Sequence, residues 1–552
     1  MLTPFILVLL FLVIVGAPLF VIMGSATALS FYWFTDDHGT LDSLLVILQA
    51  TENLVTRQEF LAIPLFMASG AIMTTGGIAS RLVTIARAGL GWLPGGVAVA
   101  SVIACIFFAA ISGSSPVTLI AVGSIMYPAM IKSGYGENFS LGLVTTAGSL
   151  GCLVPPSLAM LIYAISISAS SAKVNPQDMF LAGLVPALFI GGLLCLYAIW
   201  TGLRTKVARE PFVWAKLKAA LIDGIWALAL PFVVLGGIYG GFFNPSEAGA
   251  VATVYALFVT MGIYKELDGR KLMRSLIESA SLMGTLILII VLSFGLNEFL
   301  NDIQLNEKLI GWIRDMELGP FGFMLLVNVI LIVLGALMDS ISCTLIFAPI
   351  LAPVAWEVYG IDPLHFGVVF VVNMEIGYLA PPVATNLFVS AAVFKKPFGQ
   401  VVRAVMPTLG ITVAALIFIM YVPTISKGIV NWRDDRPIVE GFPWDGKPVG
   451  MHNSTGPATD IGSLTDQTMD VLDATLEADP TAPAVDPTAP ADPDDDPYGV
   501  GGGKAPGGVA PASPDDDPYG MGDPAPKAPA AGDPAAPKPA DGAKPAEETY
   551  DF

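Results

Sequence analysis

The chain has 552 residues, of which 54% are hydrophobic and 13% are charged, and its mean hydropathy is +0.70. Many apolar runs reach the roughly 20 residues that cross a bilayer, so we predict an all-α polytopic membrane protein and exclude a soluble globular fold. The net charge of −19 lies mostly near the C-terminus, because residues 441–552 hold 21 acidic and 5 basic residues.

Residue types that support catalysis or metal binding are scattered along the sequence. No nucleophile, base and orienting residue occur together, so we predict that the protein is not an enzyme. We also expect no cofactor and no nucleic-acid partner. The wide spacing of histidines and cysteines likewise predicts neither a metal centre nor a disulfide framework. These residues are His38, His365 and His452, and Cys105, Cys152, Cys195 and Cys343.

Apolar runs and their interruptions predict the helices in chain order. Residues 5–34 predict a retained first helix, since no basic region precedes the run as it would in a signal peptide, and residues 41–59 predict an amphipathic helix on the membrane surface. Residues 60–82 predict the next span. Residues 93–132 form two arms of about 17 residues each around Ser112–Ser115, which are short for a crossing and favour a re-entrant hairpin. After them we expect a broken helix over 138–170, spans over 179–201, 221–240, 246–264 and 277–299, a second hairpin over 320–357, a broken helix over 363–394 and a last span over about 401–422.

One stretch of the sequence occurs twice. Its first copy carries the tip motif Ser112–Ser115 and the break motif Gly151–Pro156, and its second copy carries Asp339–Ser342 and Gly377–Pro382. The first glycines of the two break motifs are 226 residues apart, and nearly the same offset aligns the rest of the stretch. The match predicts two repeats, over about 16–203 and 244–425, joined by a linker helix over about 218–240.

Each break motif places Pro-Pro inside an apolar helix. Proline has no backbone N–H and disfavours helix at the preceding residue, so carbonyl oxygens around 151–155 and 377–381 lose their helical partners. Such backbone is stable in hydrocarbon only where it is buried in protein or lines a watery cavity. A simple kink is the alternative for one break alone, whereas matched breaks in two halves favour a transport site.

Basic residues give the expected orientation. Patches at residues 204–218, 265–274 and 395–403 are separated by even numbers of crossings if each hairpin enters and leaves on one side. All three patches can then be cytoplasmic, which places the first hairpin on the cytoplasmic side and the second on the opposite side. We therefore predict inverted repeats around one midplane cavity, with a cytoplasmic N-terminus and a periplasmic tail.

The composition changes after the last predicted span. Residues 1–425 form the expected transmembrane transporter domain, and residues 426–552 form an acidic tail rich in Pro, Ala and Asp. The tail has too little apolar surface to order itself, so we predict disorder, although its Asp triplets could attract divalent cations.

The sequence also contains six longer motifs at Ala62–Phe66, Gly76–Leu82, Phe107–Ser115, Gly151–Ser157, Asn244–Ala250 and Gly377–Pro382. Over about residues 1–425 they resemble the large membrane subunit (M subunit, or DctM-like permease) of TRAP transporters, in the ion-transporter superfamily. The resemblance implies a sodium-driven, elevator-type importer of C4-dicarboxylates, sialic acid or related carboxylates in the lipid bilayer of the bacterial inner membrane. It also implies two partners, a periplasmic substrate-binding protein (P subunit) and a small four-helix membrane subunit (Q subunit), with sodium as the coupling ion.

The resemblance further implies the site residues, because hairpin tips and unwound helices bind sodium in the family. The candidate sodium ligands are Ser112, Gly113, Ser114, Ser115, Gly148, Gly151 and Pro155 in the first copy, and Asp339, Ser340, Ser342, Gly377 and Pro381 in the second. The candidate substrate ligands are Ser157, Thr385 and Asn386, since half-helix N-termini suit carboxylates, but each is equally well interpreted as a helix cap or a hydrogen-bond partner between helices. Asp339 departs from the serine-rich first tip, and protonation, another cation or a place at the interface all remain open for it.

Two alternatives remain open from the sequence. One is a stand-alone sodium- or proton-coupled anion permease of the same superfamily, which needs no binding protein. The other is a membrane scaffold that displays the acidic tail. Neighbouring genes for the two partners distinguish the first alternative, and transport after deletion of the tail distinguishes the second.

Overall fold

A computed structural model describes residues 7–8, 11–12, 19–34, 58–168, 170–207, 209–302, 308, 318–381 and 384–443. Every regular element among these residues is helical, which confirms the predicted all-α fold. Eight of the described helices are long and apolar enough to cross a membrane, or up to nine if one bent pair counts as a single span. The predicted surface helix over 41–59 lies almost wholly outside the described residues, as does most of the acidic tail.

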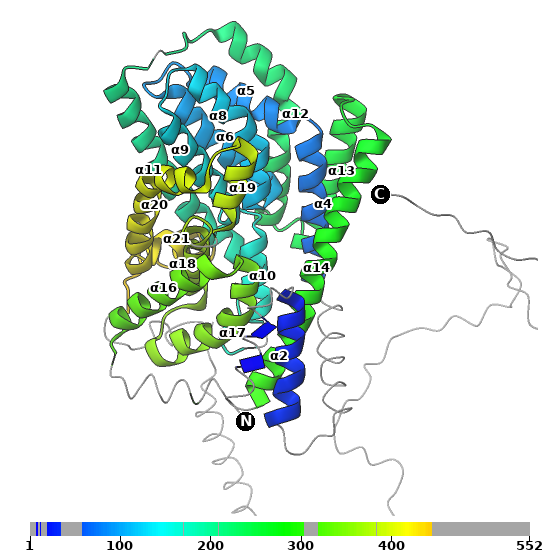
Figure 1. Cartoon of the computed structure of the whole chain (residues 1–552), viewed down its shortest axis with the longest axis vertical. Helices are drawn as coiled ribbons and strands as arrows, with labels where there is room; N and C mark the ends of the chain where they lie inside the picture. Colours follow the sequence, from blue (N-terminus) through cyan, green and yellow to red (C-terminus); the bar gives the residue numbers. More distant parts are fainter. Residues whose placement is uncertain are drawn as a thin grey trace, which may run out of the picture. The chain divides into compact units, whose positions relative to one another are not determined.

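One group of helices packs around α4. Helices α13 and α14 both pack against it, α2 packs against α14, and α12 packs against α5 and α13 (Figure 1). Helix α13 begins with a capping box, in which Asn244 accepts a hydrogen bond from the backbone of Glu247 at 2.8 Å and the Glu247 side chain accepts from Asn244. The bounds of the group are α2 Leu19–Phe34, α4 Ala62–Thr75, α5 Ile78–Leu90, α12 Trp214–Tyr239, α13 Pro245–Leu257 and α14 Gly269–Asp302.

The span expected over residues 60–82 differs from the structure. The chain bends by 69° between α4 and α5, at Gly76 and Gly77, and does not continue straight to residue 82. Gly76 packs so closely that a Cβ atom there would lie 2.2 Å from Cγ2 of Thr260, and Gly77 has a φ of +74°. Both positions therefore require glycine, and together they end the first helix early.

The other helices include two hairpins and two broken helices. In Figure 1 the first hairpin (α6 to α8) lies in the upper half of the drawn helices and the second (α16 and α17) in the lower half. Each broken helix follows its hairpin in the chain, and α11 and α20 pack beside them. The first set is α6 Gly96–Ser112, α7 Ser115–Thr118, η2 Leu119–Gly123, α8 Ser124–Lys132, α9 Glu137–Ser149, η3 Leu150–Cys152, α10 Leu158–Ser166 and α11 Pro176–Thr205. The second set is α16 Pro320–Leu337, α17 Ser340–Tyr359, α18 Pro363–Gly377, α19 Thr385–Phe394 and α20 Phe398–Tyr421.

A folded C-terminal strap continues beyond the expected end of the transporter domain. It consists of α21 (Thr424–Arg433) and residues 434–443, and α21 packs against α11 and α18. The Lys427 side chain, only 9% exposed, contacts the carboxylates of Asp362 at 2.6 Å and Glu440 at 2.7 Å. These ion pairs anchor the strap, so folded structure continues past the expected boundary at residue 426.

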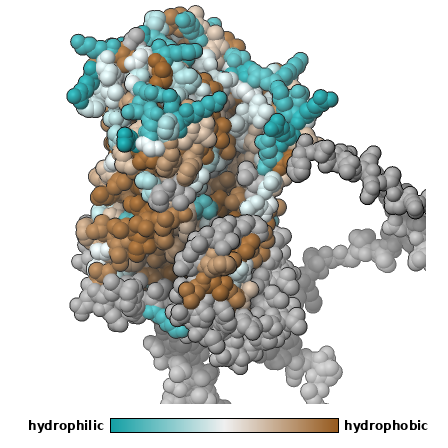
Figure 2. Space-filling view, in the orientation of Figure 1, coloured by the Kyte–Doolittle hydropathy of each residue, from teal (hydrophilic) through white to brown (hydrophobic). Residues whose placement is uncertain are grey.

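The outer surface fits a lipid environment. Figure 2 shows apolar side chains over the middle of the drawn face and hydrophilic ones gathered at its upper end. Leu196, Phe232 and Val254 are each more than half exposed. Such large apolar exposure is unfavourable in water but costs nothing against acyl chains.

Candidate functional site

The first hairpin tip lies directly against the first break. Helix α6 ends because Gly113 has a φ of +60°, and the Gly113 carbonyl accepts a hydrogen bond from the Leu158 N–H at 3.2 Å, beyond the break. A Cβ atom on Gly151 would lie 2.7 Å from the carbonyl carbon and oxygen of Ser114. The Ser112 hydroxyl lies 2.8 Å from that of Thr118. The structure thus brings the candidate ligands of the first tip and break into contact.

The other first-copy candidates have structural roles in the described chain. Ser157 is the N-cap of α10, where its hydroxyl accepts from the Met160 N–H and donates to the Cys152 carbonyl across the break. Gly148 allows α9 to approach Leu119, since a Cβ there would lie 2.8 Å from the Leu119 Cβ. Pro155 is buried in the turn between η3 and α10. Capping therefore accounts for the hydroxyl of Ser157 without a substrate.

The second hairpin tip is organised by Asp339. Its carboxylate accepts from the backbone N–H of Ser342 at 3.1 Å and from the Ser342 hydroxyl at 2.6 Å, so it caps the N-terminus of α17. The Ser340 hydroxyl reaches the carbonyl of Met374 in α18 at 3.5 Å. Asp339 therefore has a capping role at this tip, and a carboxylate is stabilised at a helix N-terminus.

The second break packs against α16, the first arm of its own hairpin. A Cβ atom on Gly377 would lie 2.6 Å from the carbonyl carbon of Gly335 in α16. Pro381 is exposed at the end of the described part of this break, and Thr385 begins α19 half-buried. The close approach of two glycine backbones leaves carbonyl oxygens, rather than side chains, at this position.

Asn386 joins the two copies. Its backbone N–H donates to the Tyr378 carbonyl at 3.2 Å, across the second break, while its side-chain amide donates to the hydroxyl of Ser115 at the first tip. The side chain is fully buried, and its Oδ1 atom has no hydrogen-bond partner among the described residues. A candidate substrate ligand of one copy therefore contacts a candidate sodium ligand of the other.

Sequence reasoning missed Glu375, although an acid within an apolar run is a strong signal of function. The side chain is fully buried in α18. Its Oε1 atom lies 3.0 Å from the hydroxyl of Ser149 at the end of α9, and its Oε2 atom has no partner in the part of the chain that the structure describes. Asn373, two residues nearer the start of α18, is also buried and also has an unpartnered Oδ1 atom.

The site therefore combines hydroxyls, broken-helix carbonyls and buried amide and carboxylate oxygens. Hard cations prefer such oxygen ligands, and most of these ligands add no formal charge. The described residues contain no group of three His, Cys, Asp or Glu side chains that could hold a metal ion.

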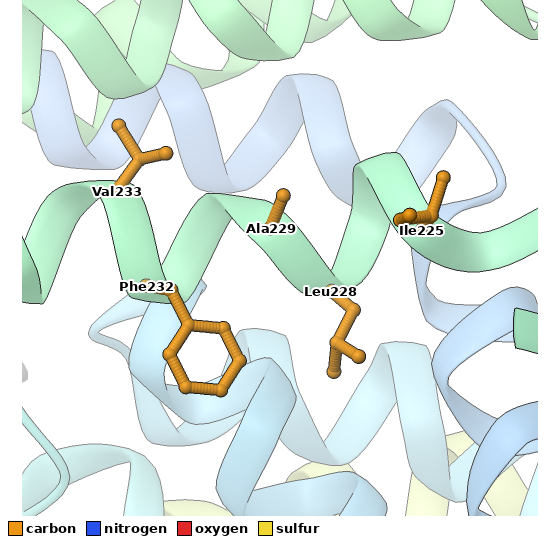
Figure 3. A pocket seen from close by; sticks show the side chains of 5 residues that line it. All are labelled: Ile225, Leu228, Ala229, Phe232 and Val233. Carbon is orange, nitrogen blue, oxygen red and sulfur yellow. The ribbon is translucent and has the colours of Figure 1, made fainter.

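An apolar pocket elsewhere in the structure does not suit an organic anion. It lies along α12 and is lined by Ile225, Leu228, Ala229, Phe232 and Val233 (Figure 3). These side chains offer no hydrogen bond or charge, so the pocket suits acyl chains of lipid rather than a carboxylate.

The chain is similar to known membrane transport proteins. Residues 6–425 match the family described as the tripartite ATP-independent periplasmic transporter, DctM component. The C4-dicarboxylate TRAP transporter large permease protein DctM of Pseudomonas aeruginosa is 40% identical over 411 residues, covering 74% of this chain and 94% of that protein. The isethionate TRAP transporter permease protein DctMQ of Oleidesulfovibrio alaskensis is 37% identical over 373 residues, covering 66% of this chain and 57% of that protein.

A solved structure supports the fold alone. The YdaH transporter of Alcanivorax borkumensis matches with a TM-score of 0.52 at 14% identity, covering 74% of this chain and 91% of that one.

Since the family match spans most of the sequence, the chain belongs to the DctM family of large permeases of tripartite ATP-independent periplasmic (TRAP) transporters, which are multi-pass proteins of the bacterial inner membrane and not a class of enzyme.

Proposed function

We propose that this permease imports organic acids driven by sodium, with C4-dicarboxylates as the first candidates. The observation that carries the proposal is the joined site, where Ser115 of the first tip bonds to Asn386 beyond the second break. Asn386 adds a buried oxygen without a partner among the described residues. Oxygen ligands suit sodium, and bound sodium offsets the negative charge of a carboxylate substrate.

The minimum number of coupling ions follows from electrostatics. At about 100 mV, inside negative, each inward positive charge gains roughly 2.3 kcal/mol, whereas a dianion loses roughly 4.6 kcal/mol. A tenfold sodium gradient adds roughly 1.4 kcal/mol per ion. One sodium ion therefore cannot concentrate a dianion inside, while two leave roughly 2.8 kcal/mol, enough for about a hundredfold accumulation.

The paired elements suggest how the site reaches both sides. The hairpins lie in opposite halves of the drawn helices, and each one contacts a broken helix (Figure 1). We infer inverted repeats whose hairpins and broken helices move together as an elevator against the helices around α4. A periplasmic binding protein delivers the substrate, and a small four-helix subunit completes the membrane complex.

Transport by the reconstituted complex tests this proposal. Vesicles that contain the permease and its small subunit should accumulate a labelled C4-dicarboxylate only with an inward sodium gradient and the loaded binding protein. A panel with isethionate and other carboxylates identifies the substrate, and potassium in place of sodium is the control. Uptake undiminished without the binding protein would instead support a stand-alone permease, and uptake driven equally by a proton gradient would contradict the sodium coupling.

A further inference from the structure

One hydrogen bond connects a residue to its own counterpart in the other copy. Ser149 and Glu375, whose side chains lie 3.0 Å apart, are 226 residues apart in the sequence. The break glycines 151 and 377 have the same offset. Helices α9 and α18 also begin at the same offset, at Glu137 and Pro363. The contact therefore joins equivalent positions on equivalent helices.

Equivalent positions can touch only near the axis that relates the two copies. By contrast, the bond between Ser115 and Asn386 spans 271 residues and joins positions that are not equivalent. Ser149 and Glu375 each lie two residues before a break glycine, so each is attached almost directly to one broken helix. A shift of either break must therefore displace the partner across the axis.

We propose that the Ser149–Glu375 hydrogen bond couples the two breaks, so that sodium bound at one raises the affinity at the other. The two residues are positioning residues in this scheme, and the inference rests on the proposed sodium coupling. Both side chains are fully buried, so water cannot replace the bond when it breaks. The Ser149 hydroxyl also lies 2.7 Å from the Thr146 carbonyl in its own helix, which holds it in place.

Two substitutions separate the bond from the charge. Ser149→Ala removes the bond and keeps the carboxyl group, whereas Glu375→Gln removes the carboxyl group but keeps an amide that can donate to or accept from Ser149. Thr145→Ala is the matched control, because Thr145 lies one turn earlier on α9 and is equally buried. Its hydroxyl lies 2.7 Å from that of Ser390, 245 residues away, so this bond does not join equivalent positions.

The experiment measures initial uptake against sodium concentration in vesicles that contain the assembled complex. We expect a Hill coefficient above one for the wild type, Thr145→Ala and Glu375→Gln, and a coefficient near one for Ser149→Ala with a severalfold higher half-saturating sodium concentration. Ser149→Cys, a weaker donor of similar size, provides the same comparison if the alanine variant does not assemble, and it should lower the coefficient partly.

Several outcomes would overturn the coupling. Wild-type cooperativity in Ser149→Ala, or in Ser149→Cys where that variant replaces it, excludes the coupling. A loss of cooperativity in Glu375→Gln alone also excludes the coupling, because it would assign the effect to the charge. A hyperbolic sodium response of the wild type also removes it while leaving sodium-driven import intact. Wild-type uptake that ignores sodium altogether contradicts the proposed function itself.

Discussion

Substituting Gly151 by alanine should weaken sodium binding at the first tip. The added Cβ atom would lie 2.7 Å from the Ser114 carbonyl and 2.8 Å from the Ser115 nitrogen, all of them backbone atoms that no rotamer change can move. Ordinary contacts between carbon atoms are about 3.5–4.0 Å, so tip and break must separate by roughly 1 Å. Overpacking of this kind costs roughly 1–3 kcal/mol, which corresponds to about a fivefold to hundredfold loss of sodium affinity if it falls on the ion-bound form.

The assay for Gly151→Ala is sodium-dependent uptake in vesicles, at substrate saturation, with the amount of inserted protein measured in each preparation. Gly410→Ala is the matched control, since it changes a glycine in α20 where an added Cβ meets nothing within 4 Å. The control should keep the wild-type half-saturating sodium concentration and maximal rate. Equal sodium dependence in Gly151→Ala and the wild type would refute the argument that tip and break form the ion site.

Three further outcomes are expected. Ser115→Ala and Ser342→Ala should each raise the half-saturating sodium concentration, and unchanged curves for both would remove these hydroxyls from the ion sites. Lys427→Met should lower the free energy of unfolding, measured in a thermal melt, by roughly 2–3 kcal/mol. The loss is smaller than for a fully buried ion pair because the partners of Lys427 are partly exposed. Lys218→Met, which changes an exposed lysine, should leave the free energy of unfolding unchanged. Protease added outside intact spheroplasts should cut the chain beyond residue 443, and full protection would contradict the periplasmic tail.

The tips and breaks could be predicted because their causes are local. Gly113 ends α6 through its own backbone conformation. The proline pairs interrupt their helices by a local effect that does not depend on what these helices pack against. The bend at Gly76–Gly77 was missed because the apolar run continues through it, and hydropathy does not report a change of direction. The positive φ of Gly77 and the close approach of Thr260 to Gly76 appear only in the folded chain.

The contacts that assemble the site could not be predicted in the same way. Asn386 and Ser115 meet across 271 residues, and no periodicity within either helix specifies that partner. Glu375 was visible as an acid in an apolar run, but its pairing with Ser149 required the packing of α18 against the first broken helix. The C-terminal strap was not predicted, because the ion pair between Lys427 and Glu440 forms only in the folded chain.

The C-terminal strap also has a mechanical consequence. A force applied to the chain beyond residue 443 meets Lys427 and Glu440 before it reaches α20, because the ion pairs tie this segment to Asp362 at the start of α18. Tension is therefore delivered to the cap of the second broken helix, and α20 is shielded from being unwound. A pull on the acidic tail is therefore transmitted to α18, the helix that carries Glu375.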